Sequence, residues 1–87
     1  MDEILFLFFN NIRRKIIQDE LKIIGVPITN IEGELLDSLS ILINTIQVLK
    51  DMLNKYMDRE VRNLVISIVG LEHYKEFMEV FLDYKTN

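Results

Sequence analysis

The sequence predicts an all-α fold, an up-and-down helical bundle that forms one domain over residues 1–87. Apolar residues recur every three or four positions along most of the chain, which is the spacing of one α-helix face. Helix breakers are rare, and the clearest break is the segment GVPITN at residues 25–30. The segment LVISIV, residues 64–69, is β-branched enough for a strand, but the chain offers no second strand to pair with it. We therefore expect four helices, at about residues 2–24, 30–57, 59–69 and 71–85.

Length and composition indicate a small folded domain with little stability to spare. Hydrophobic residues make up 49% and charged residues 28% of the 87 residues, which excludes a disordered chain. A domain of this size buries only about 60–65% of the surface of its unfolded chain, so its own core gives marginal stability. Association with a partner is a common way to add stability to such a chain.

The first predicted helix, residues 2–24, opens with consecutive apolar residues at positions 4–9. A secretory signal would need a positively charged flank, whereas Asp2 and Glu3 precede this run. A membrane span needs about 20 apolar residues, so the run is also too short to cross a bilayer. Gly25 and Pro27 end the helix. Two apolar stripes are predicted to face neighbouring helices, formed by Leu5, Phe9, Ile12, Ile16 and Ile23, and by Phe6, Ile17, Leu21 and Ile24.

On this helical phase, Ile4, Leu7 and Phe8 project from the opposite side of the helix. Large apolar side chains left in water forgo roughly 1.5–3 kcal/mol each relative to burial. An exposed apolar patch of this kind marks a protein-binding surface. Two alternatives remain open, because fraying and loose packing could hide these side chains, or the last helix could fold back and cover them with Phe81 and Tyr84.

The second predicted helix, residues 30–57, begins at a capping box made by Thr29 and Glu32. It carries the strongest periodic signal, a heptad pattern of Leu35, Leu39, Leu42, Ile46, Leu49, Leu53 and Tyr56. Further apolar residues widen this seam on both sides, so we expect the helix to have neighbours on more than one side. The predicted protein interface combines the first helix with part of this wide apolar surface, namely Ile4, Leu7, Phe8, Ile41, Val48 and Met52.

The last third of the chain predicts two helices separated at Gly70. Asp58 is a suitable N-cap for residues 59–69. The apolar faces before and after Gly70 differ in direction by about 120°, so a straight helix would point one of them into water. A turn at Gly70 resolves this conflict. The alternative is one helix kinked at Gly70, which would make a bundle of three helices.

No catalytic, cofactor or metal site is predicted. The chain has no cysteine, and His73 is its only histidine. His73 lies between Glu72 and Glu76, but the spacing differs from the Glu-x-x-His motif of metal sites in helical bundles, so a surface histidine is the simpler interpretation. There is no phosphate-binding glycine loop and no nucleophile–base pair. We therefore expect a protein that is not an enzyme.

Two charged clusters are candidate contact surfaces. An acidic ridge of Glu72, Glu76, Glu79 and Asp83 could dock a basic partner, although a solvated face is the simpler interpretation. A basic cluster of Arg13, Arg14, Lys15 and Lys22 is interpreted as a solvated flank that pairs with Asp19 or another helix. The formal net charge of −4 argues against a general binder of nucleic acid or anionic membranes.

These observations predict a non-enzymatic helical protein–protein interaction module, a self-associating or accessory subunit of a larger assembly. A homodimer is the simplest form, because two-fold pairing is the commonest symmetric solution. The first alternative is a small acidic inhibitor or regulator of a partner protein, and the second is a nucleic-acid-binding regulator. The absence of cysteine fits a cytoplasmic protein. The lack of alanine beside 13 isoleucines is typical of AT-rich coding sequence, which fits a viral or mobile-element origin.

Overall fold

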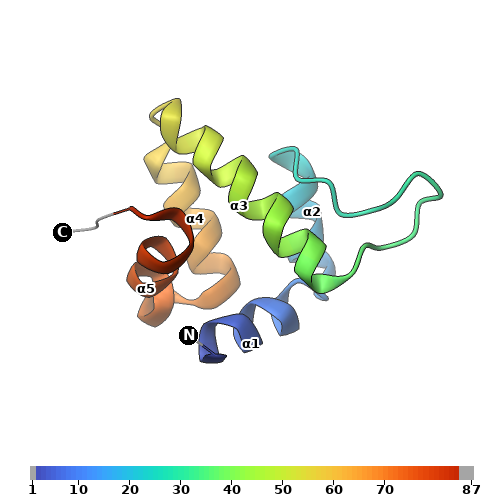
Figure 1. Cartoon of the computed structure of the whole chain (residues 1–87), viewed down its shortest axis with the longest axis horizontal. Helices are drawn as coiled ribbons and strands as arrows, with labels where there is room; N and C mark the ends of the chain where they lie inside the picture. The colour runs from blue at the N-terminus through green and yellow to red at the C-terminus, as the bar shows by residue number, and fades with distance from the viewer. Residues whose placement is uncertain (1, 85–87) are drawn as a thin grey trace.

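The computed structural model describes residues 2–84, and these residues form five α-helices without a strand. The helices are α1 (Asp2–Asn11), α2 (Lys15–Ile23), α3 (Ser38–Asn54), α4 (Asp58–Val69) and α5 (Leu71–Leu82). The all-α class is confirmed, whereas the predicted counts of four or three helices are wrong. Helix α4 is central and contacts each of the other four helices. Figure 1 shows α1 running crosswise to α3, so the helices do not stack as a simple up-and-down bundle.

The predicted helix at residues 2–24 is two helices, separated by a turn at residues 12–14. Arg14 has extended backbone angles, with φ −76° and ψ 133°. The turn is held by the Gln18 side chain, whose Nε2 donates to the Ile12 carbonyl at 3.0 Å. A second bond is long-range, since Asn11 Nδ2 donates to the Ile68 carbonyl of α4 at 2.6 Å. Because the chain turns between them, the buried faces of α1 and α2 do not lie along one side of a single continuous helix.

The second predicted helix starts eight positions later than expected, at Ser38. The capping residue is Asp37, whose carboxylate accepts the Ser40 backbone N–H at 2.9 Å, so the Thr29–Glu32 capping box is wrong. Residues 24–37 instead form a loop that we call the arm, which projects from the helices in Figure 1. Helix α3 also ends before the predicted boundary, at Asn54.

The arm is ordered by its own hydrogen bonds. Asn30 Oδ1 accepts the backbone N–H groups of Glu32 and Glu34, each at 2.9 Å, and so closes a tight Asx turn. The Leu36 N–H donates to the Ile28 carbonyl at 2.8 Å, so the two sides of the arm run antiparallel. Because Ile28 is buried, the arm is fixed to the core at its base.

Gly70 separates α4 from α5, as predicted, and the alternative of one kinked helix is wrong. Its backbone angles of φ +89° and ψ 159° are accessible almost only to glycine. Asp58 is the first residue of α4 and not its N-cap, a position that Met57 occupies. The Asp58 carboxylate accepts a hydrogen bond from the Tyr84 hydroxyl, which ties the start of α4 to the residues after α5.

All five helices contribute to a single core. Phe8 of α1 stacks on Phe77 of α5, with ring centroids 6.2 Å apart. Leu21 of α2, Leu49 of α3 and Val65 of α4 are also buried. The core thus joins the first helix to the last one and leaves their remaining faces to solvent.

Candidate protein interface

Most of the predicted interface residues lie in the core. Ile4 and Phe8 have no exposed surface, because α5 packs over that side of α1. Ile41 and Met52 are buried as well, whereas Leu7 and Val48 are half-buried against the core. The six residues therefore do not form an exposed surface, and this part of the prediction is wrong. The alternative in which the last helix folds back over these side chains describes the structure better. The residue that stacks on Phe8 is Phe77, however, and not the expected Phe81 or Tyr84.

Several of the exposed apolar side chains are ones that the sequence patterns assigned to buried stripes. Phe6, expected in the core, is 65% exposed, and Ile16 and Ile23 are exposed on α2. Leu35, Leu39 and Tyr56 of the predicted heptad seam are exposed too. For Phe6, Ile16 and Ile23, the error arose because a single unbroken helical phase was assumed across the turn at residues 12–14. The large apolar side chains that remain exposed are Phe6, Ile16, Ile23, Ile31, Leu35, Leu39, Ile43, Tyr56, Leu71 and Val80.

Three of these side chains form what we call the α3 strip, which consists of Leu35, Leu39 and Ile43. Leu39 and Ile43 are 58% and 48% exposed and lie one turn apart on α3. Leu35 is half exposed at the end of the arm that leads into the helix. Residues 38–49 carry no charged side chain, although 28% of the whole chain is charged. The α3 strip is therefore apolar and exposed, and its part on α3 is free of charge, while the Asp37 carboxylate lies between Leu35 and Leu39 at the start of the helix.

Polar groups beside the α3 strip already have partners within the chain. The Ser40 hydroxyl donates to the Asp37 carboxylate at 2.9 Å. Asn44 Nδ2 donates to the Pro27 carbonyl at 3.0 Å, which also joins the arm to α3. Covering the strip would consequently leave these two side chains hydrogen-bonded.

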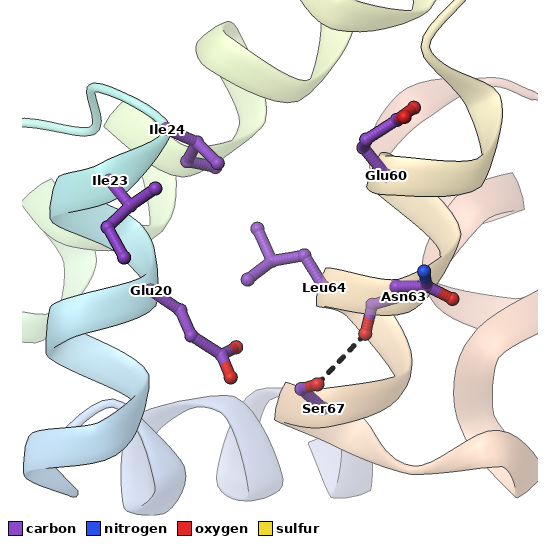
Figure 2. Close-up of a pocket in the computed structure, with 7 residues that line it drawn as sticks. All are labelled: Glu20, Ile23, Ile24, Glu60, Asn63, Leu64 and Ser67. Carbon is purple, nitrogen blue, oxygen red and sulfur yellow. Dashed lines mark hydrogen bonds between the residues drawn. The ribbon is translucent and has the colours of Figure 1, made fainter.

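A second candidate surface is a groove of about 290 Å³ between α2 and α4, which we call the α2–α4 groove. Figure 2 shows Glu20 and Ile23 on the α2 wall, with Leu64 projecting between the two helices. Ile23 is 83% exposed. The α4 wall includes Glu60 at one end and Ser67 at the other, and the Ser67 hydroxyl donates to the Asn63 carbonyl at 2.9 Å. The seven lining residues are Glu20, Ile23, Ile24, Glu60, Asn63, Leu64 and Ser67.

Among the described residues, the carboxylates of this groove have no cationic partner. Glu20 and Glu60 stand in opposite walls, and neither takes part in an ion pair among residues 2–84. The Arg62 guanidinium lies 5.6 Å from the centroid of the Tyr74 ring of α5 and makes a cation–π contact with it. The α2–α4 groove therefore combines an apolar floor with two available negative charges.

The structure leaves the predicted charged clusters exposed. Glu72, Glu76 and Glu79 share one side of α5, and Asp83 is exposed where that helix ends. In the basic cluster, Lys15 Nζ lies 3.4 Å from Asp19 Oδ1, which confirms the predicted pairing. Whether either cluster binds a partner stays a prediction.

His73 is more enclosed than a surface histidine, with its side chain 20% exposed. Its Nε2 lies 3.6 Å from Oε1 of Glu3, so α5 contacts α1 through a polar pair at this point. Within residues 2–84, no group of three His, Cys, Asp or Glu side chains is placed to hold a metal ion.

Comparisons with protein families, curated proteins and solved structures found no match for this chain. None of the helices in the described part of the chain has the length and apolar character needed to cross a membrane. The surface chemistry of the α3 strip and of the α2–α4 groove is consequently the basis for the function proposed below.

Proposed function

We propose that this chain is a non-enzymatic protein-interaction module that pairs with a second copy of itself through the α3 strip. The observation that supports this proposal is an exposed apolar surface on a helix stretch without charged residues. Exposed apolar surface is typical of a protein-binding site. Leu39 and Ile43, one turn apart, provide the ridge on which a second helix packs.

A second copy fits the strip because of charge. The chain has a net charge of −4, so most of its surfaces repel a second copy. Residues 38–49 carry no charge, so this stretch of α3 brings no like charges together when two copies approach through Leu39 and Ile43. A two-fold axis through the strip would use the same three side chains of each copy.

The expected affinity is modest. Each of the three side chains is about half exposed, so its burial contributes roughly 1 kcal/mol. Six such side chains in a dimer contribute roughly 6 kcal/mol, against an association cost of about 4–15 kcal/mol. The net gain is therefore at most about 2 kcal/mol, so we expect weak pairing that is populated only at protein concentrations on the order of 10 mM or above.

The test is the molar mass in solution, measured by light scattering over a dilution series. The wild type should change from dimer to monomer on dilution, whereas the double variant Leu39→Asp with Ile43→Asp should be monomeric throughout. The matched control is Val80→Asp, which places a new carboxylate at an exposed apolar position of α5 and should dimerise like the wild type.

A wild type that stays monomeric at every concentration would contradict the proposal. Equal loss of dimer in Val80→Asp would also contradict it, because the effect would then follow net charge and not the α3 strip. Circular dichroism on all variants verifies that each retains its helices.

A further inference from the structure

We propose that the α2–α4 groove is a second docking surface, which binds a segment of another protein with one apolar side chain flanked by two basic side chains. This inference goes beyond the pairing of two copies, because it concerns a different face and a different partner. The groove lies between α2 and α4, whereas the α3 strip includes Leu35, Leu39 and Ile43. A dimer formed through α3 would therefore present two such grooves.

The apolar part of the groove indicates what lies at the centre of the bound segment. Figure 2 shows Leu64 between the walls, with Ile23 and Ile24 close to one end of it. Ile23 is exposed to water when the groove is empty. An aliphatic side chain on the partner would cover chiefly Ile23, because Leu64 is only 6% exposed, and the gain is proportional to the apolar area removed from water.

The charged part indicates the flanks of the bound segment. Glu20 and Glu60 lie in opposite walls, on either side of Leu64 in Figure 2. Neither has an ion-pair partner in residues 2–84, so two basic side chains of a ligand would meet available carboxylates. Charge complementarity of this kind selects the partner and speeds its association.

A second copy of this chain fits the groove less well than another protein does. The arm carries the exposed Ile31 near its tip, but Glu32 and Glu34 follow it closely and would be repelled by the groove. Arg14 precedes α2 and the exposed Ile16 lies in its first turn, but Ile16 is on the same face of α2 as Glu20. Reciprocal docking of that turn would place the two Glu20 carboxylates of a dimer near each other.

Two other hollows in the described structure support weaker arguments. The one between α1 and α5 includes Glu3 and Glu72, but Glu3 already lies 3.6 Å from His73. The one beside Tyr84 is lined by Lys50 and contains no carboxylate. Of these three hollows, only the α2–α4 groove joins an apolar floor to two carboxylates without an ion-pair partner among the described residues.

The test is a titration with a synthetic helical probe, a fluorescein-labelled alanine-based peptide with one leucine and a lysine one turn away on each side. Fluorescence anisotropy should show saturable binding that weakens as salt is added, because the lysine contacts are screened. The double variant Glu20→Gln with Glu60→Gln should bind the probe about tenfold more weakly or worse. Ile23→Ser should also weaken binding, and its exposed position leaves the fold intact.

The matched control is Glu72→Gln with Glu79→Gln, which removes the same charge from the exposed side of α5. This control and the monomeric Leu39→Asp, Ile43→Asp variant should bind the probe like the wild type. The second comparison separates the groove from the α3 strip, so failure of either proposal is visible independently of the other.

Three results would overturn the inference. The first is absence of saturable binding by the wild type. The second is an equal loss in the α5 control, since the probe would then respond to net charge alone. The third is a fall in molar mass of the wild-type dimer when Glu20 and Glu60 are replaced, because the groove would then be occupied by a second copy.

Discussion

At the residue scale, Phe8 shows how contacts between distant parts of the chain decide which side of α1 is buried. Its ring stacks on Phe77 and meets Phe9 edge-on, with both centroid distances 6.2 Å. Phe77 in turn lies 4.9 Å from Phe81. These aromatic contacts connect α1 with α5, so replacing Phe8 should loosen the first and last helices together.

Phe8→Ala is expected to lower the free energy of unfolding by about 3–5 kcal/mol, because it leaves a cavity among buried side chains. Phe6→Ala removes the same ring from a position that is 65% exposed and should change stability by about 0.5 kcal/mol or less. Urea denaturation followed by circular dichroism, at one protein concentration, measures both. A Phe6 variant that is as destabilised as the Phe8 variant would show that α1 buries the other face.

The sequence does not determine which of these two phenylalanines is buried. Positions 4–9 are all apolar, so this stretch lacks the contrast between apolar and polar faces that sets the phase of a helix. The phase was therefore taken from residues further along, beyond the turn at residues 12–14. That turn changes the direction in which the side chains of α1 point relative to those of α2, and the predicted inner and outer faces of the first helix were consequently wrong.

At the element scale, the start of α3 is decided by competition between two polar turns. Thr29 and Glu32 match a capping box, but the Asn30 side chain accepts the N–H groups of Glu32 and Glu34 and turns the chain back. Asp37 then caps α3. Hydrogen bonds from the Ser40 backbone N–H and then from its hydroxyl hold the pKa of Asp37 below its ordinary value.

The lowered pKa of Asp37 gives a pH-dependent contribution to stability. Because the folded-state pKa lies below the unfolded one, the contribution is present above about pH 4 and is lost as pH falls through the folded pKa. Asp37→Ala should lower Tm by about 4–8 °C at neutral pH, and by less at about pH 2.5. Asp37→Asn is the control, since asparagine caps a helix without titrating and should keep most of the Tm.

Thermal unfolding followed by circular dichroism at the two pH values measures these differences. An Asp37→Ala deficit that is as large in acid as at neutral pH would mean that the ionised carboxylate does not stabilise α3.

The break between α1 and α2 has no local signal in the sequence. Residues 12–14 contain neither glycine nor proline. One of the bonds that hold the turn comes from Asn11 to the Ile68 carbonyl of α4, a residue far along the chain. By contrast, the break at Gly70 was predictable, because both the glycine and the change of apolar face lie within the local sequence.

At the scale of the whole molecule, the all-α class follows from periodicity, but the candidate surfaces do not. The α2–α4 groove exists because Glu20 is brought opposite Glu60 and Leu64 by the packing of α2 on α4. Patterns between neighbouring residues in the sequence cannot reveal this contact, because Glu20 and Glu60 lie far apart along the chain. The α3 strip was visible in the sequence, yet its residues were assigned to the interior because a heptad pattern is typical of a buried seam.

The pairing of two copies through α3 is the central claim, and NMR on mixed samples tests it most directly. Equal amounts of isotope-labelled and unlabelled protein are combined above the concentration at which the dimer forms, and only contacts between different copies are recorded. We predict intermolecular contacts from the methyl groups of Leu39 and Ile43. Intermolecular contacts from Ile23 or Val80 instead, with none from α3, would contradict the account.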